Sequence, residues 1–137
     1  MNRIRLALVA VIGLLAAQTV WAAQPHPFAG FPEDPAERAR AFATCAGRYA
    51  GIIEHGSAIG ADASSARSRR DTFTALVDAS GPGVDAAGPG DLLRYRLGAK
   101  RAIARLLILS QTHADRHRAR TAATLARRLI AMCDTLI

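Results

Sequence analysis

Apolar residues recur at intervals of three and four in several segments of the chain, the spacing of helices that bury one face. The first such segment begins at Asp34, whose carboxylate can cap a helix. Pro35 suits the first turn, and Glu37 completes a capping box. This helix is expected to end at Gly56, and a second helix is expected over residues 63–79.

The second half of the chain continues the same pattern. A third helix is expected from about Asp91, and its many leucines make it the most apolar segment, which predicts a central position. The pattern breaks at residues 112–115 and resumes as a fourth helix. Residues 80–90 hold six glycines and prolines and are expected to form a loop. The prediction is an all-α domain over residues 34–137, an up-down-up-down four-helix bundle with antiparallel first and fourth helices.

The first 22 residues follow a different pattern. Arg3 and Arg5 precede an apolar run of about 12 residues, and small residues close the segment before Ala23. This layout predicts a secretory signal peptide over residues 1–22, so the mature protein is expected to be periplasmic or secreted. An uncleaved anchor is the alternative. Because a membrane-spanning helix needs roughly 20 apolar residues, we expect no transmembrane helix in the mature chain.

Residues 23–33 are expected to form an extended arm before the domain. Three prolines interrupt any helix there, since proline lacks an N–H donor and restricts the residue before it. Phe28 and Phe31 lie in this arm. We expect these rings to pack back on the domain, with docking to a partner as the alternative.

Composition agrees with a single helical domain. Half of the residues are hydrophobic, many of them alanine, and only 5% are aromatic, which favours close-packed helices over a β-sheet. Roughly 115 residues would follow the signal peptide, enough for one modest core.

Cys45 and Cys133 are the only cysteines, and both lie on apolar faces of predicted helices. Because disulfides form in exported proteins, we predict that the two are bonded to each other. Redox catalysis is the alternative, but the chain has no C-x-x-C pair. A C-x-x-C-H haem attachment motif is also missing from the sequence, and no cofactor is expected.

Charge is divided unevenly along the chain. Residues 24–93 hold 6 arginines and 9 acidic residues, whereas residues 94–137 hold 10 basic and 2 acidic residues. A basic half can bind anionic partners, and export favours lipid, lipopolysaccharide or polysaccharide over nucleic acid. An ordinary solvated face is the alternative. The candidate binding residues are Arg94, Arg96, Arg101, Arg105, Arg116, Arg120, Arg127 and Arg128.

The chain offers few residues for catalysis. Glu54 and His55 are adjacent, and neighbours on a helix do not face each other, so His55 is expected to interact with the free carbonyls that end the first helix. Ser57 and Ser110 lack the G-x-S-x-G context of a hydrolase nucleophile. We expect no catalytic residues.

A metal site is a weaker alternative near the last turn. His113 and His117 have the i, i+4 spacing of helical metal ligands, with Asp115 between them. The predicted helix break and the surrounding arginines favour a solvated turn instead. No metal is expected.

The segment CAGRYAGIIEH, from Cys45 to His55, together with Cys133, resembles small exported two-cysteine helical proteins of unassigned function. The resemblance implies a disulfide-stapled helical domain and supplies no catalytic residues. We expect a non-enzymatic accessory or adaptor that binds an exported or envelope protein through its helix faces and arm. The alternative is a binder of anionic envelope components through the arginine-rich face, and an enzyme is the third hypothesis.

Overall fold

The computed structural model describes residues 31–137, so the predicted signal peptide and most of the predicted arm lie outside the described residues. Five helices follow one another in this part of the chain: α1 (Pro35–Ala58), α2 (Ser64–Ala79), α3 (Pro82–Ala87), α4 (Pro89–Thr112) and α5 (Arg116–Asp134). All regular secondary structure within residues 31–137 is helical, which confirms the predicted fold class.

Side-chain caps set the starts of α1 and α5. The Asp34 carboxylate accepts a hydrogen bond of 2.9 Å from the backbone N–H of Glu37, which confirms the predicted cap. The reciprocal bond of the predicted capping box, from the Glu37 side chain, is not formed among residues 31–137. Asp115 caps α5 in the same way: its carboxylate accepts a hydrogen bond of 2.8 Å from the backbone N–H of His117. The predicted break between the last two helices is therefore confirmed, and Asp115 supplies the restart.

Helix α3 lies inside the segment that was expected to be a loop, so that prediction is wrong. Gly81 and Gly88, with φ of +41° and +82°, bound the helix, and Pro82 opens it. The residues between them are compatible with a short helix. Gly83 packs closely on α1, since a Cβ there would lie 2.4 Å from the carbonyl oxygen of Pro35.

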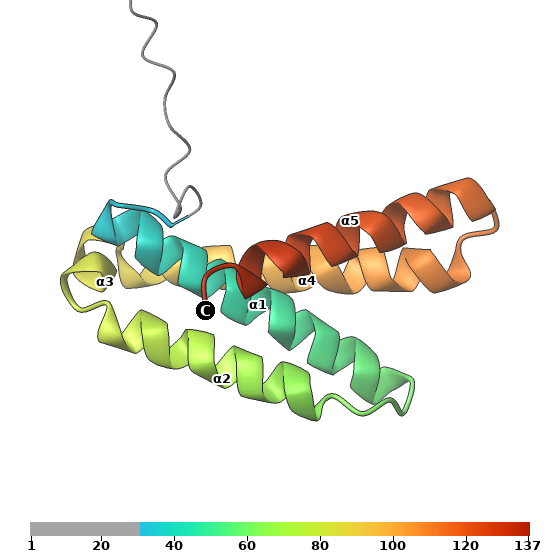
Figure 1. The fold of residues 1–137 in the computed structure, drawn as a ribbon, viewed down its shortest axis with the longest axis horizontal. Coiled ribbons are helices and arrows are strands. Elements are labelled where there is room, and N and C mark those ends of the chain that lie inside the picture. Colours follow the sequence, from blue (N-terminus) through green and yellow to red (C-terminus); the bar gives the residue numbers. More distant parts are fainter. Residues whose placement is uncertain (1–30) are drawn as a thin grey trace, which may run out of the picture.

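The fold consists of two helical hairpins that cross. Figure 1 shows α1–α2 as one hairpin and α4–α5 as the other, diverging at the end opposite α3. Helix α1 contacts each of the other four helices, so the central helix is α1 and not the more apolar α4. Helix α5 packs mainly on α4 and contacts α1 less extensively, which differs from the predicted four-helix bundle with α1 and α5 as full neighbours.

Small residues allow α1 and α4 to cross at short range. Ala39, Ala43, Gly47 and Gly51 recur every four residues on α1, and all are buried. A Cβ on Gly47 would lie only 2.1 Å from the carbonyl oxygen of Arg96 on α4. The crossing therefore depends on small residues at these positions, and on glycine at Gly47 and Gly51.

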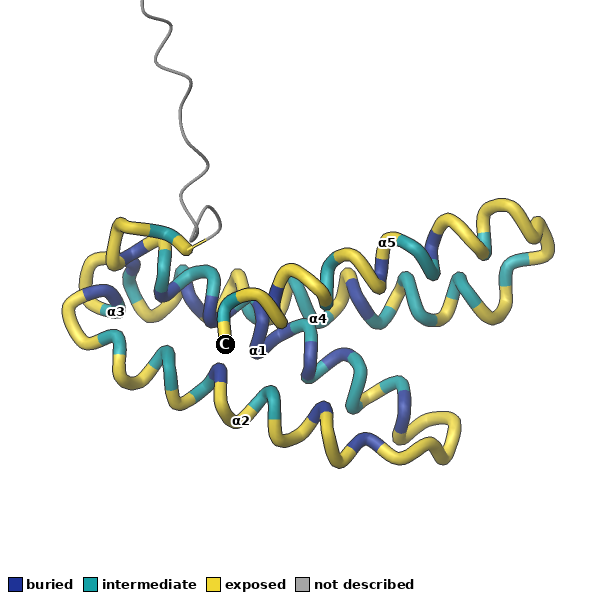
Figure 2. Tube along the Cα trace, in the orientation of Figure 1, coloured by how far each residue is buried: buried dark blue, intermediate teal, exposed yellow. Residues whose placement is uncertain are grey.

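The main core lies where α1, α2 and α5 meet. Its buried members are Phe42, Cys45, Ala46, Tyr49, Ala66, Phe73 and Cys133. Phe31 packs against Phe42 with ring centroids 5.9 Å apart, which confirms that this part of the arm folds back, while Phe28 lies outside the described residues. In Figure 2 the buried positions concentrate on α1, and the far ends of α4 and α5 are mostly exposed or intermediate.

Candidate functional site

The two cysteines meet inside the main core. The Sγ atoms of Cys45 and Cys133 lie 2.06 Å apart, at bonding distance, so the predicted pairing is confirmed. Arg48 lies one helical turn along from Cys45. Its Nη1 donates to the carbonyl oxygen of Leu129 at 2.7 Å and to the Sγ of Cys133 at 3.3 Å. The disulfide and Arg48 together tie the middle of α1 to the end of α5.

A second polar link closes the same region. The hydroxyl of Tyr49 donates to the carboxylate of Asp134 at 2.6 Å, and Arg69 of α2 approaches that carboxylate at 3.9 Å. The Tyr49 ring stacks on Phe73, with centroids 5.9 Å apart. Burial and the interaction with Asp134 raise the pKa of Tyr49 to about 12. These contacts are structural, because the tyrosine is buried and its hydroxyl is already paired.

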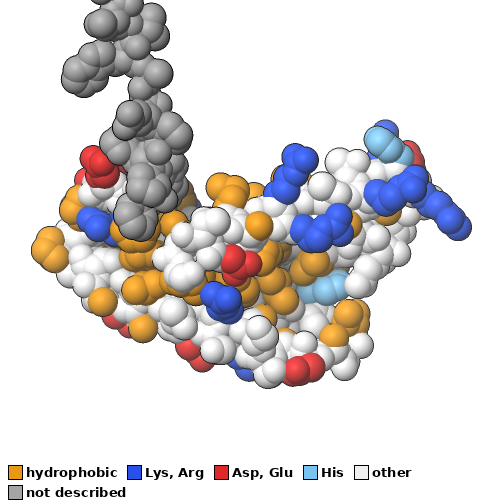
Figure 3. Space-filling view, viewed as in Figure 1, with side chains coloured by type: hydrophobic (Ala, Val, Ile, Leu, Met, Phe, Trp, Pro, Cys, Tyr) orange, Lys and Arg blue, Asp and Glu red, His pale blue; other side chains and the backbone are white. Residues whose placement is uncertain are grey.

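The predicted binding arginines are distributed over different hollows of the surface. Arg94 lines a cavity between α1, α4 and α5, Arg96 lines another beside α3, and Arg101 with Arg105 borders a third next to Glu54 of α1. Figure 3 shows further basic side chains along α5 and at the α4–α5 tip. By helical spacing, Arg94, Arg101 and Arg105 lie on one side of α4. Arg96 lies on the other side, so the four arginines of this helix do not form one continuous face.

Most of these arginines lack an ionic partner. Of the eight candidates, only Arg94 has a carboxylate oxygen within 4.0 Å among residues 31–137, from Asp91. Lys100, which was not a candidate, pairs with Glu54 at 2.8 Å and joins α4 to α1. The basic charge of the α4–α5 hairpin is therefore largely uncompensated within the described chain.

One flank of α4 exposes apolar side chains. Leu93, Leu97 and Ile108 are 55%, 39% and 51% exposed and share a face by their helical spacing. Leu92 and Ile103, in contrast, face the interior and are buried. The leucines of this helix therefore belong to two faces and do not form the single apolar group that was expected. The sequence signal for these two faces was that Leu92 and Leu93 are adjacent, because adjacent residues on a helix point in different directions.

Hollows accompany the exposed stripe of Leu93, Leu97 and Ile108. A cavity of about 470 Å³ is lined by Leu97, Ile108, Lys100, Arg101 and Arg105 together with Glu54. A second cavity of about 250 Å³ contains Leu93, and it reaches residues of α1, α2 and α3. The stripe is therefore an uneven apolar surface with basic borders and is the strongest candidate for a protein contact.

The residues considered for catalysis do not assemble. Glu54 points to Lys100 and forms no pair with His55. The Nε2 atom of His55 is buried and has no hydrogen-bond partner among residues 31–137. His55 lies in the last turn of α1, as expected, but this atom makes no hydrogen bond to the carbonyl groups there. Ser110 donates to the carbonyl oxygen of Leu107, as helical serines commonly do.

The two histidines of the last turn belong to different parts of the backbone. His113 follows α4, and its Nδ1 accepts from the N–H of Asp115, whereas His117 lies in the first turn of α5. Within residues 31–137 no group of three or more His, Cys, Asp or Glu side chains is arranged to hold a metal ion. In the same range no helix is both long and apolar enough to span a membrane.

No known family model, curated protein or solved structure matches this chain. The resemblance of the Cys45–His55 segment to exported two-cysteine proteins thus stays a prediction. The functional argument rests on the chain's own surface.

Proposed function

We propose that this protein is a non-enzymatic accessory or adaptor protein of the periplasm or extracellular space that binds a protein partner. The observation that carries the proposal is the exposed apolar stripe of Leu93, Leu97 and Ile108 on α4. Exposed apolar residues that line up along one helix face, rather than being scattered, mark interaction surfaces in soluble proteins. An amphipathic helix of the partner fits such a surface through apolar anchors at matching spacing.

The borders of the stripe specify the charge of the partner. Arg101 and Arg105 flank Leu97 and Ile108 and have no carboxylate within 4.0 Å among residues 31–137. An acidic helix would place its carboxylates beside these guanidinium groups, and such complementarity increases the association rate and selects the partner. The proposed partner is therefore an exported or envelope protein with an acidic amphipathic helix.

The experiment is affinity purification of the mature protein from the cell envelope, followed by mass spectrometry. We expect one protein in stoichiometric amount with the wild type. Leu97→Asp should abolish its recovery, because the change puts a charge in the centre of the stripe. Leu125→Asp is the matched control, since Leu125 is an exposed leucine on α5, outside the stripe. Equal recovery of the same partner by all three proteins would contradict the proposal.

A second candidate function is binding of anionic envelope lipid or polysaccharide. The observation that favours it is the set of exposed arginines on α5, including Arg116, Arg120 and Arg127, which lack ionic partners among residues 31–137. Phosphate contacts weaken steeply as salt rises, whereas apolar helix docking does not. Cosedimentation with phosphatidylglycerol vesicles separates the two functions when it is measured at about 50 mM and about 500 mM NaCl, a tenfold difference in salt. Salt-sensitive vesicle binding that is lost in Arg116→Gln/Arg120→Gln and retained in Leu97→Asp would support the lipid function.

A further inference from the structure

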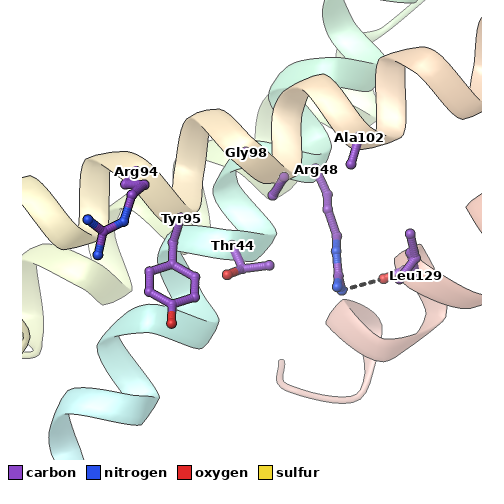
Figure 4. A pocket seen from close by; sticks show the side chains of 8 residues that line it. Thr44, Arg48, Arg94, Tyr95, Gly98, Ala102 and Leu129 are labelled. Atoms are coloured by element: carbon purple, nitrogen blue, oxygen red, sulfur yellow. Dashed lines mark hydrogen bonds between the residues drawn. The ribbon is translucent and has the colours of Figure 1, made fainter.

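A separate cavity lies on the opposite flank of α4. It has a volume of about 390 Å³ and is bounded by α1, α4 and the end of α5. Figure 4 shows Tyr95 and Arg48 projecting into the same region from α4 and α1, with Thr44 and Gly98 between them. Cavities of this size hold small ligands. By helical spacing, Tyr95 and Gly98 face away from the stripe of Leu93 and Leu97.

The walls of the cavity are largely apolar. Gly98, Ala99, Ala102 and Leu129 contribute no polar side chain. Thr44 lines the cavity too, but its hydroxyl already donates to the carbonyl oxygen of Arg40 at 2.8 Å. The cavity therefore suits a ligand with an apolar body and few polar groups.

Arg48 is the principal charge in the cavity and is incompletely paired. Only its Nη1 atom donates within residues 31–137, to the Leu129 carbonyl oxygen and the Cys133 sulfur, so Nη2 and Nε have no acceptor there. No carboxylate lies within 4.0 Å of its guanidinium in the described chain. Burial lowers the pKa of Arg48. A half-buried cation without an opposite charge is unfavourable, and a bound anion would relieve this cost.

The other polar groups indicate an anion of low charge. Arg94 also lines the cavity, but it is paired with Asp91, which additionally accepts from Arg40 at 3.1 Å. The exposed Tyr95 hydroxyl makes no hydrogen bond within residues 31–137 and is available as a donor. The unpaired guanidinium nitrogens of Arg48 match a carboxylate, which accepts two parallel hydrogen bonds from arginine.

We propose that the cavity between Arg48, Tyr95 and Gly98 binds the carboxylate of a small amphipathic ligand. The carboxylate lies against Arg48, and its apolar body lies on Gly98, Ala99, Ala102 and Leu129. The same chemistry occurs in a free carboxylic acid and in the C-terminal residue of a polypeptide. This binding site is independent of the helix-docking surface on the other flank of α4.

The test is a titration of the disulfide-intact protein with n-octanoate, followed by amide chemical shifts in NMR spectra. The neutral probe is n-octanol, which has the same chain length. We expect saturable octanoate binding, with shifts concentrated at the cavity, and at least tenfold weaker binding of octanol. N-acetyl-Gly-Gly-Leu with a free or an amidated C-terminus distinguishes the polypeptide source from the free acid.

Two variants address the cavity itself. Arg48→Gln should weaken carboxylate binding at least tenfold. Gly98→Leu fills the cavity while leaving Arg48 in place, and it keeps the test valid if Arg48→Gln fails to fold. A Cβ at residue 98 meets no atom within 4 Å, so the added side chain starts in open space. Gly90→Leu is the matched control, because Gly90 is an equally open glycine of α4 that does not line the cavity.

The outcomes are decisive in both directions. Binding of octanoate alone assigns the cavity to free carboxylic acids, and binding of the free-acid peptide assigns it to polypeptide C-termini. In either case the affinity must fall at least tenfold in Gly98→Leu and must stay within twofold of the wild type in Gly90→Leu. Equal affinity for octanol, undiminished binding by Gly98→Leu, or failure of both carboxylate probes to saturate would overturn the proposal.

Discussion

The two ends of α5 differ in how they are held. Near its C-terminus, Cys133 is bonded to Cys45, Asp134 accepts from Tyr49, and the Leu129 carbonyl accepts from Arg48. At its N-terminus the helix packs on α4 and is capped by Asp115, and Figure 1 shows this end diverging from α1 and α2. One end is part of the main core, and the other is a two-helix projection.

This difference separates stability from binding. The covalent bond, the aromatic stacking and the partly buried hydrogen bond between Tyr49 and Asp134 all lie at the α1–α2–α5 junction. The projection carries exposed arginines and Ile108, which contribute little to the core. Substitutions at the junction should therefore change the free energy of unfolding strongly, and substitutions in the projection should change it weakly.

The largest expected effect is loss of the disulfide. Its two cysteines are 88 residues apart, and closing a loop of this length contributes about 4.6 kcal/mol in the chain-entropy model. Cys45→Ser should thus lower the melting temperature markedly in thermal denaturation. Dithiothreitol should destabilise the wild type and have no effect on the variant. An unchanged melting temperature for Cys45→Ser would contradict the stabilising role of the bond.

Gly47→Ala comes next, because it tests the α1–α4 crossing. The added Cβ would lie 2.1 Å from the carbonyl oxygen of Arg96, so the helices must separate. We expect a loss of about 3 kcal/mol in urea denaturation, typical of severe overpacking. Gly98→Ala is the matched control: its Cβ meets nothing within 4 Å, and alanine favours a helix by about 0.5–1 kcal/mol over glycine. Equal stabilities for the two variants would refute the close crossing.

The buried Tyr49 hydroxyl should make the junction sensitive to alkali. Its pKa is raised from 10.0 to about 12 in the folded state. The protonated hydroxyl therefore contributes fully to the free energy of unfolding below pH 10, and this contribution is lost as pH rises toward 12. Two pKa units correspond to an effect on the order of 2 kcal/mol. Wild type should lose this extra stability between pH 10 and 12, and Tyr49→Phe should not. Parallel pH profiles for the two proteins would contradict a raised pKa of Tyr49 in the folded state.

Asp115→Ala should have the smallest effect of the four, because it acts in the projection. Asp115 caps α5 through hydrogen bonds to the N–H groups of His117 and Arg118. Loss of a helix cap costs about 1 kcal/mol. Hydrogen exchange should increase in the first turn of α5 and stay unchanged around Cys133. Faster exchange at the disulfide would show that the two ends are more strongly coupled than the structure indicates.

Local signals in the sequence were sufficient for much of the fold. Asp34, Pro35 and Glu37 marked the start of α1, and the break at residues 112–115 separated the last two helices. The cysteine pair followed from the apolar faces and the predicted compartment. These features depend on neighbouring residues or on the small number of cysteines, so they can be read without knowing the tertiary arrangement.

The packing of the helices was less accessible. The four-residue repeat of Ala39, Ala43, Gly47 and Gly51 contained the signal for a close crossing, but it does not identify α4 as the partner helix. The high content of apolar residues in α4 had indicated that this helix is the central one. The actual centre is α1, because small residues allow more neighbours to approach one helix than large ones do.

The candidate sites illustrate the same limit. Arginine-rich composition identified the basic half, but the half-buried guanidinium whose pKa is lowered by burial belongs to Arg48 on α1, in the acidic half of the sequence. Its position depends on Leu129 and Cys133, which are more than 80 residues away along the chain. Such a cavity arises only when three helices meet.

The disulfide also determines how the molecule responds to cleavage. Because Cys45 and Cys133 are joined, the peptide segment between them is a covalent ring that contains α2, α3, α4 and most of α5. A protease that cuts once in the turn before α2, or once in the turn before α5, opens this ring without releasing a fragment. The nicked chain would run as one species on a non-reducing gel and as two after reduction.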